Sequence, residues 1–224
     1  MFNSDTLELL VSSFPKILEF GLKVTLPLAA IAFILSTVIA VIVAMIQYAN
    51  VPVLRQISRF YIWIIRGTPL LVQLMVAFYG LPLIGIRANP FVMAVIVFSF
   101  NEGAYSSETM RAAMEAVPAG QLEAGYCSGL NYLQIMWHII LPQAFRTAFP
   151  SLFNALISMV KDTSLASSIT VVEMFTRTKQ IAGQSYNYFP LYIEVALVYL
   201  IFCTVLTYLQ KKGEKILGTY GVRK

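Results

Sequence analysis

Long stretches without a single charged residue are the feature that most limits how this chain can fold. No Asp, Glu, Lys or Arg occurs in residues 24–54, 67–86 or 195–210. A run of about 20 apolar residues is long enough to cross the roughly 30 Å hydrocarbon core of a bilayer. Of the 224 residues, 58% are hydrophobic and only 12% are charged, and a water-soluble core of this size could not bury so much apolar surface. The sequence therefore predicts membrane-spanning helices.

Five such helices are expected, separated by proline, glycine and polar residues. We place them at residues 17–46, 61–84, 90–114, 146–168 and 189–209. The predicted protein is an all-α, polytopic membrane protein with five transmembrane helices, forming one domain over residues 1–224. The polar stretch 173–188 is expected to form a gate or re-entrant connection on the outer side.

The charges at the ends of the apolar runs predict the orientation. Arg55 and Arg59 follow the first run, and Lys211 and Lys212 follow the last. Cytoplasmic ends of membrane helices are enriched in Lys and Arg, so the carboxyl end is expected in the cytoplasm and, with five spans, the amino end outside. The net charge of +5 does not indicate a nucleic-acid binder, because no basic stripe with exposed aromatic residues is visible. No cleavable signal peptide is expected.

The sequence offers little support for an enzyme, a metal site or a channel. Cys127 and Cys203 fall at different depths, so we expect neither a disulfide nor a metal site. An intramembrane enzyme would need a nucleophile–base pair, and the Ser106–Ser107–Glu108 run has no histidine or lysine at a useful helical offset. A channel would need a filter, for which only residues 173–188 are available. No catalytic or metal-binding residue is assigned, and both alternatives stay open.

A polar, glycine-containing segment at about 118–145 lies between two apolar runs. It contains Glu123-Ala124-Gly125, then Gly129, then Ile139-Ile140-Leu141-Pro142. This spacing resembles the cytoplasmic Glu-Ala-Ala loop of ATP-binding-cassette (ABC) importer permeases, with Gly125 in place of the second alanine. The resemblance implies that an ATPase subunit docks here, at Glu123, Ala124, Gly129, Leu141 and Pro142. The alternative is an amphipathic helix lying on the membrane, but such helices usually carry Lys or Arg, and residues 115–145 have none.

Three further stretches, at residues 66–73, 103–111 and 161–165, look like the polar amino-acid branch of these permeases, including arginine, lysine and histidine permeases. The resemblance implies a type I ABC-importer permease fold in the inner cell membrane. It also implies two ATP-binding subunits, a second permease copy that is identical or related, and an extracytoplasmic solute-binding protein. The chain has no phosphate-loop motif, so no cofactor is expected on it, and ATP with Mg²⁺ would bind the partner subunit.

Glu102 and Asp162 are acidic residues inside the predicted spans, where a charge is costly and usually functional. Glu102 lies about 18 Å along its helix from Pro90, and Asp162 about 24 Å along its helix from Arg146. With Asn101, Lys161 and Ser164 nearby in sequence, they predict a pocket for a cationic amino acid. The alternative is structural: Asp162 pairs with Lys161 or caps a helix break, and Glu102 pairs within the bundle.

Glu108, Arg111 and Glu115 share one helix face near the cytoplasmic end, a spacing that favours ion pairs. Arg66 either closes the inner mouth by pairing with a carboxylate or extends to the lipid headgroups. Arg66, Glu108 and Arg111 are the candidates for gating or ion pairing, and for the face that Glu108 and Arg111 share with Glu115 the structural role is favoured.

Overall fold

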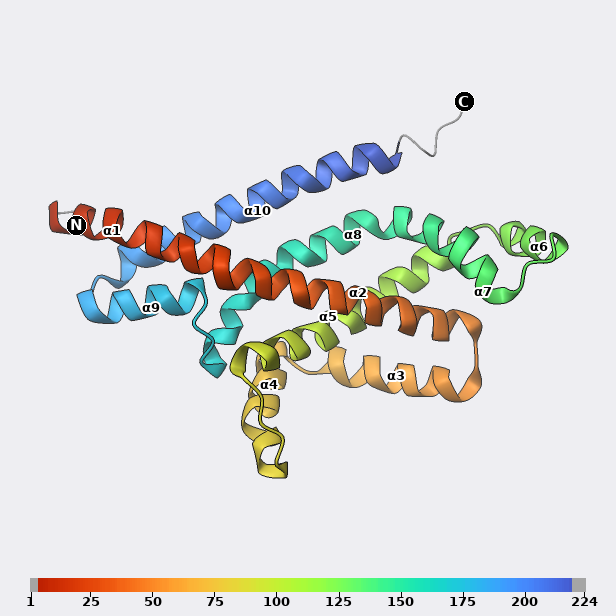
Figure 1. Ribbon diagram of the computed structural model, residues 1–224, viewed down its shortest axis with the longest axis horizontal. Coiled ribbons are helices and arrows are strands. Elements are labelled where there is room, and N and C mark those ends of the chain that lie inside the picture. The colour runs from red at the N-terminus through yellow and green to blue at the C-terminus, as the bar shows by residue number, and fades with distance from the viewer. Residues whose placement is uncertain (1–3, 219–224) are drawn as a thin grey trace. The chain divides into compact units, whose positions relative to one another are not determined.

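The structure is a computed structural model that describes residues 4–218, and every regular element within them is helical (Figure 1). The α-helices are α1 (Ser4–Phe20), α2 (Leu26–Ala49), α3 (Pro52–Gly67), α4 (Leu70–Met75), α5 (Pro90–Glu115), α6 (Ala119–Cys127), α7 (Tyr132–Ile135), α8 (Leu141–Asp162), α9 (Met174–Ser185) and α10 (Tyr188–Gly218). Between them lie the π-helical turns η1 (Gly21–Thr25), η2 (Val76–Gly80) and η4 (Met136–Ile140), and the 3-10 turns η3 (Leu81–Ile84) and η5 (Thr163–Ile169). The all-α prediction is confirmed.

Fewer helices are long and apolar enough to cross a membrane than the five that the sequence predicts. Within residues 4–218, Ser4–Ala49 and Tyr188–Gly218 are long and apolar enough to cross a membrane. The count rises to four if Pro52–Gly67 with Leu70–Ile84, and Tyr132–Ile169 with Met174–Ser185, each make one span. The α5 helix covers the expected third span without a break, but Asn101 and Glu102 lower its apolar character. Five spans therefore stay a prediction.

The span expected over residues 61–84 is not one continuous helix. The chain leaves the helix at Gly67, and Thr68 and Pro69 are both extended, with ψ angles of 143° and 137°. Proline disfavours helical conformation in the residue before it and lacks a backbone N–H, which explains the break. Hydropathy alone did not reveal it because both flanking segments are apolar.

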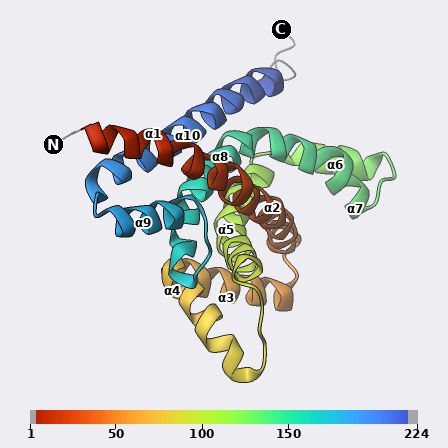
Figure 2. The ribbon, with the colours of Figure 1, turned by 60° about the vertical axis from the view of Figure 1, so that its left-hand side comes forward.

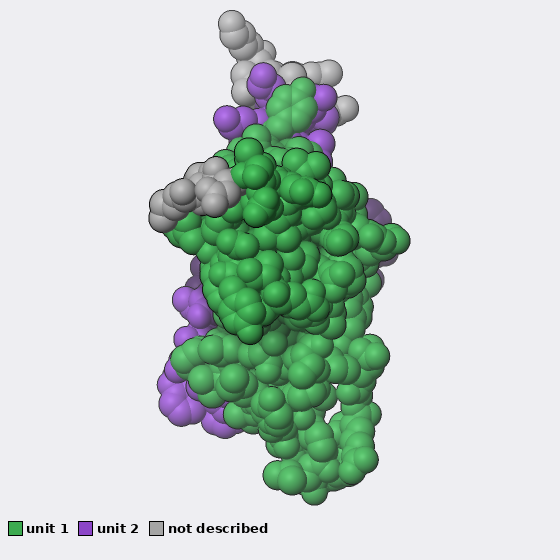
Figure 3. Space-filling model, turned by 90° about the vertical axis from the view of Figure 1, so that its left-hand side faces the viewer, with its two compact units in different colours: residues 1–34, 69–99, 156–208 green, residues 35–68, 100–155, 209–224 purple. Residues whose placement is uncertain are grey.

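The chain divides into two compact units (Figure 3). Unit 1 comprises residues 1–34, 69–99 and 156–208, and unit 2 comprises residues 35–68, 100–155 and 209–224. The main core of unit 1 joins the start of α2, α4, the first half of α5, the end of α8 and η5. Its largest buried members include Leu28, Leu74, Met93, Phe98 and Ile169. The expectation of one permease domain over the whole chain stays a prediction.

A second cluster in unit 1 holds α1, α9 and the first part of α10 together. Ile17, Met174 and Val198 are fully buried in it. Figures 1 and 2 both show α9 beside α1. Glu173, also fully buried, caps α9 by accepting hydrogen bonds from the backbone N–H groups of Phe175 (2.7 Å) and Thr176 (2.6 Å). The polar stretch 173–188 thus contains a capped helix.

Unit 2 brings α2, α3 and the second half of α5 close together. A Cβ atom added to Gly103 on α5 would lie 2.7 Å from Ile39 Cγ2 on α2, so only glycine allows this approach without a shift. The Tyr61 hydroxyl on α3 donates to the Phe100 carbonyl at 2.5 Å. The segment predicted to dock an ATPase, residues 118–145, also belongs to this unit.

Candidate functional site: a helical hairpin and an arginine-lined cavity

The segment between α5 and α8 folds into two short helices joined by a tight turn. The α6 helix ends in a Schellman motif: Leu130 N–H donates to the Gly125 carbonyl (3.1 Å), and Gly129 N–H donates to that of Tyr126 (2.9 Å). Gly129 has a φ of +78°, a conformation that glycine adopts at little cost. Gly129 thus ends α6.

The next helix begins with a reciprocal capping box. Asn131 accepts a hydrogen bond from Gln134 N–H (3.0 Å), and the Gln134 side chain accepts one from Asn131 N–H (2.9 Å). Gly125 on α6 packs against this helix, because a Cβ atom there would lie 2.8 Å from Ile135 Cγ1. An alanine here, as in the Glu-Ala-Ala loop that this segment resembles, would require Ile135 to shift. We call residues 119–140 the docking hairpin.

One face of α6 is exposed and made of small residues around a carboxylate. Gly120, Glu123, Ala124 and Cys127 follow helical spacing and are all exposed. Within residues 4–218, the Glu123 carboxylate makes no hydrogen bond or ion pair. Such a face lets another protein approach closely and offers it a free negative charge.

The apolar residues of the hairpin divide between two surfaces. Ile135 and Met136 are fully buried, whereas Leu133 and Trp137 are 59% and 61% exposed. At the start of α8, Leu141 is buried and Pro142 exposed. Glu123, Ala124, Pro142, Leu133 and Trp137 are therefore accessible to a partner, while Gly129 and Leu141 shape the hairpin.

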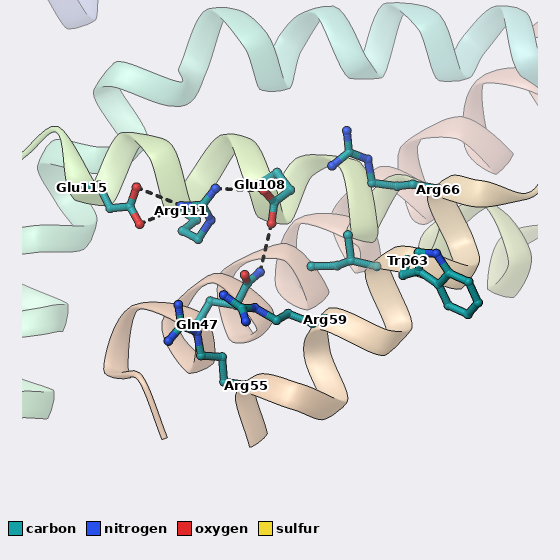
Figure 4. Close-up of a pocket in the computed structure, with 9 residues that line it drawn as sticks. Gln47, Arg55, Arg59, Trp63, Arg66, Glu108, Arg111 and Glu115 are labelled. Atoms are coloured by element: carbon teal, nitrogen blue, oxygen red, sulfur yellow. Dashed lines mark hydrogen bonds and ion pairs between the residues drawn. The ribbon is translucent and has the colours of Figure 1, made fainter. Parts of the chain in front are cut away.

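The ion pairs favoured by the spacing on α5 are present. Arg111 lies 2.9 Å from Glu108 and 2.7 Å from Glu115. Glu108 also accepts a hydrogen bond from the Gln47 amide on α2 (3.1 Å), so it links two helices of unit 2 (Figure 4). Among the described residues, Arg66 makes no ion pair, and its guanidinium lies 5.2 Å from the centre of the Tyr105 ring.

The predicted substrate residues lie in both units. In unit 2, Asn101 is buried on α5, and Glu102 accepts a hydrogen bond from Ser106 at 2.6 Å. In unit 1, Asp162 ends α8, and Lys161 and Ser164 line a cavity of about 380 Å³ with the aromatic residues Phe175, Tyr192 and Tyr199. The joint pocket of Glu102 and Asp162 stays a prediction.

Glu194 is a functional candidate that sequence reasoning missed. It is 7% exposed on α10 and accepts a hydrogen bond from Ser13 on α1 at 2.6 Å. The only signal in the sequence is a lone carboxylate beside the charge-free run 195–210, and its partner is far away along the chain.

The side chains of residues 4–218 offer no group of three His, Cys, Asp or Glu that could hold a metal ion. Cys127 and Cys203 are free thiols.

The chain matches a family of known transport proteins over residues 36–215, described as "Binding-protein-dependent transport system inner membrane component". It is 42% identical to the L-cystine transport system permease protein TcyB of Bacillus subtilis, over 95% of this chain and 92% of that protein. It is 38% identical to the putative glutamine transport system permease protein GlnP of Rickettsia felis, over 93% and 97% of the two chains. Identity to the arginine transport system permease protein ArtQ of Bacillus subtilis is 33%, over 92% and 94%.

Solved structures show the same fold. A crystal structure of an amino acid ABC transporter with histidines matches with a TM-score of 0.79 and 29% identity, over 91% of this chain and 96% of that chain. The inward-facing MetNI methionine ABC transporter matches with a TM-score of 0.72 over 96% and 99%, and at 17% identity this is a likeness of fold alone. The chain therefore belongs to the family of binding-protein-dependent transport system inner membrane components, the permease subunits of ABC importers.

Proposed function

We propose that this chain carries amino acids through the membrane as the permease subunit of an ATP-driven importer. The observation that carries the proposal is full-length similarity to permeases named for cystine, glutamine and arginine. The chain is a permease subunit and not an enzyme, and ATP hydrolysis belongs to a separate subunit.

The docking hairpin supports the coupling part of this proposal. An ATPase subunit would seat against the exposed face of α6, where Glu123 can pair with a cation on the partner and Gly120 and Ala124 allow close contact. The helix Tyr132–Ile169 begins within the hairpin, so movement of the docked partner would act directly on a membrane helix. ATP and Mg²⁺ would bind the partner.

The complete assembly would contain two ATPase subunits, a second permease copy and an extracytoplasmic binding protein. The basic residues beside the apolar runs support an amino end outside and a carboxyl end in the cytoplasm. The docking hairpin would then face the cytoplasm, where ATP is available. Residues 219–224, which include the last two cationic side chains, lie outside the described residues.

For the substrate, we propose cationic or polar L-amino acids. The support is the pair of carboxylates Glu102 and Asp162, which would bind a cationic side chain and the α-ammonium group. Lys161 and Ser164 line the cavity of about 380 Å³ in unit 1, and Lys161 would bind the α-carboxylate. Arginine, lysine and histidine fit this arrangement of charges.

Cystine is the second candidate, because the permease named for it is 42% identical to this chain. Cystine carries two carboxylates and two ammonium groups and has no net charge. Binding it would require cations as well as carboxylates, and Lys161 beside Phe175 and Tyr199 supplies a cation in a mostly apolar cavity.

Uptake measurements on the complete transporter test the proposal. The chain is reconstituted with its ATPase and binding protein in liposomes, and uptake of labelled arginine, lysine, histidine, glutamine and cystine is measured with and without ATP. ATP-dependent uptake of any of them supports amino-acid import, and its absence for all five overturns it.

The Glu102→Gln variant then separates the substrate classes. If Glu102 binds the cationic side chain and Asp162 the α-ammonium group that every substrate carries, the variant should lower uptake of arginine and lysine at least tenfold and leave glutamine uptake within twofold. Equal effects on all substrates would contradict binding of the cationic side chain by Glu102. Ser99→Ala, a change at a buried hydroxyl that donates to backbone carbonyls, controls for general disturbance of α5.

A further inference from the structure

A cavity in unit 2 is lined by an unusual concentration of guanidinium groups (Figure 4). Its volume is about 350 Å³, and four arginines but only two glutamates line it. The arginines come from α3 and α5 and converge on the same space. The lining residues that matter are Arg55, Arg59, Arg66, Arg111, Glu108 and Glu115.

Both carboxylates are already engaged by one arginine. Arg111 pairs with Glu108 and Glu115. Among residues 4–218, Arg55 bonds only the uncharged Asn50 side chain, and Arg66 lies over the Tyr105 ring. Arg59 makes no hydrogen bond or ion pair within the same described part of the chain. The cavity therefore carries surplus positive charge and suits an anion.

The helix that supplies most of this charge is amphipathic. Arg55, Arg59 and Arg66 lie at positions i, i+4 and i+11, on one face of α3. On the opposite face, four apolar side chains are between 40% and 68% exposed: Val53, Ile57, Phe60 and Ile64. An exposed apolar stripe of this kind suits contact with lipid or with another protein.

Trp63 connects the two faces. It lines the cavity and is 71% exposed, and its ring lies 5.9 Å from that of Phe60 on the apolar stripe. Tryptophan side chains are enriched at the level of lipid headgroups, where an apolar ring meets a polar surface. The cationic cavity is therefore continuous with the exposed apolar stripe of α3.

We propose that this cavity binds the phosphate group of an anionic phospholipid. The guanidinium groups of Arg55 and Arg59 would hold the phosphate oxygens, and the acyl chains would lie along Trp63 and Phe60. Arginine suits this role because its planar fork binds phosphate through two parallel hydrogen bonds. Basic pockets between membrane helices are known to bind such headgroups.

A soluble phosphate would use the same chemistry but would gain nothing from the apolar stripe. An acidic segment of a partner protein would also fit the charge. The bilayer is favoured because the exposed apolar face and Trp63 belong to the same helix as the arginines. The experiment distinguishes all three sources.

The complete transporter is placed in nanodiscs of phosphatidylcholine containing increasing amounts of phosphatidylglycerol. Bound phosphatidylglycerol is then counted per complex by native mass spectrometry. The test variant is Arg55→Gln/Arg59→Gln, and the control is Lys211→Gln/Lys212→Gln, which removes two charges from α10 outside the cavity. The test variant should bind about 30-fold more weakly than the wild type, because each cation near a headgroup contributes about fivefold, and the control, whose charges lie outside the cavity, should bind more tightly than the test variant.

Three results would overturn the proposal. Equal binding by the test variant and wild type would exclude the cavity as the lipid site. Inorganic phosphate that binds in pure phosphatidylcholine and displaces no phosphatidylglycerol would indicate a soluble anion. Loss of the ATPase or binding protein with unchanged lipid binding would indicate a protein contact. If the double variant fails to assemble, Arg59→Gln alone, at an exposed residue without a partner in residues 4–218, should weaken binding about fivefold.

Discussion

Gly125 lies so close to Ile135 that a single added methyl group would fall 2.8 Å from the Ile135 Cγ1 atom. Ile135 is fully buried, so it has little room to move. We expect Gly125→Ala to cost about 1–3 kcal/mol of hairpin stability through overpacking. Thermal unfolding and co-purification of the ATPase subunit measure the effect.

Gly120→Ala is the matched control, because nothing lies within 4 Å of its added Cβ. Alanine is also the better helix former, by up to about 1 kcal/mol. Gly120→Ala should therefore leave stability equal or higher. If both variants behave alike, the packing of Gly125 on Ile135 does not set the hairpin geometry.

Reversing the charge of Glu123 should weaken attachment of the ATPase. A lost charge pair at a protein interface costs about 2–5 kcal/mol when it is buried there, so Glu123→Lys should reduce co-purification of the ATPase at least tenfold. Gln121→Lys adds the same charge at another exposed position of α6 and should have little effect. Normal ATP-driven uptake by Glu123→Lys would remove Glu123 from the docking surface.

Cys127 provides a direct test of the orientation. It is exposed on α6, whereas Cys203 is only partly exposed on α10. A maleimide that cannot cross membranes should label the wild type in inside-out vesicles and not in right-side-out vesicles, and bound ATPase should slow the labelling. Cys127→Ser reports any labelling of Cys203. Labelling from the outside would reverse the proposed topology.

The hydrogen bond between Ser13 and Glu194 should stabilise unit 1. Both side chains are buried and the oxygens lie 2.6 Å apart, so Ser13→Ala should cost about 1–3 kcal/mol by leaving a buried polar group unsatisfied. Ser12→Ala removes an exposed hydroxyl with only a local backbone bond and should change stability by less than about 0.5 kcal/mol. Apparent Tm values in nanodiscs compare the two.

The contact between Gln47 and Glu108 should couple α2 to α5. A double-mutant cycle of Gln47→Ala and Glu108→Gln should give a coupling energy of about 0.5–1.5 kcal/mol. The cycle of Gln47→Ala with Glu115→Gln serves as a reference, because Glu115 pairs with Arg111 and not with Gln47. Equal couplings in the two cycles would show that Glu108 does not link the helices.

Features that depend only on residues close together in the sequence were predictable. Gly129 ends α6 in a turn that glycine favours, and the ion pairs of Arg111 follow from helical spacing alone. The docking role of residues 118–145 comes from family resemblance and stays a prediction. Hydropathy located the apolar segments but not the helix break at Thr68 and Pro69. A hydropathy average over many residues does not register two extended residues between apolar segments.

Features that depend on tertiary contacts were not predictable. Ser13 and Glu194 meet although 181 positions separate them. The role of Gly125 requires knowing that Ile135 packs against it. Likewise, the sequence uses the arginines of α3 only to predict which side of the membrane is cytoplasmic. Their position beside Arg111 of α5 is visible only in the fold.

The helix break at Thr68 and Pro69 determines which surroundings the backbone can have at that point. The α3 helix has 16 residues and is about 24 Å long, too short to cross the roughly 30 Å hydrocarbon layer alone. If α3 and α4 together make one crossing, backbone amides and carbonyls at the interruption lie at a depth where acyl chains cannot hydrogen-bond them. That point must then border water or other protein, and lipid tails are kept away from it.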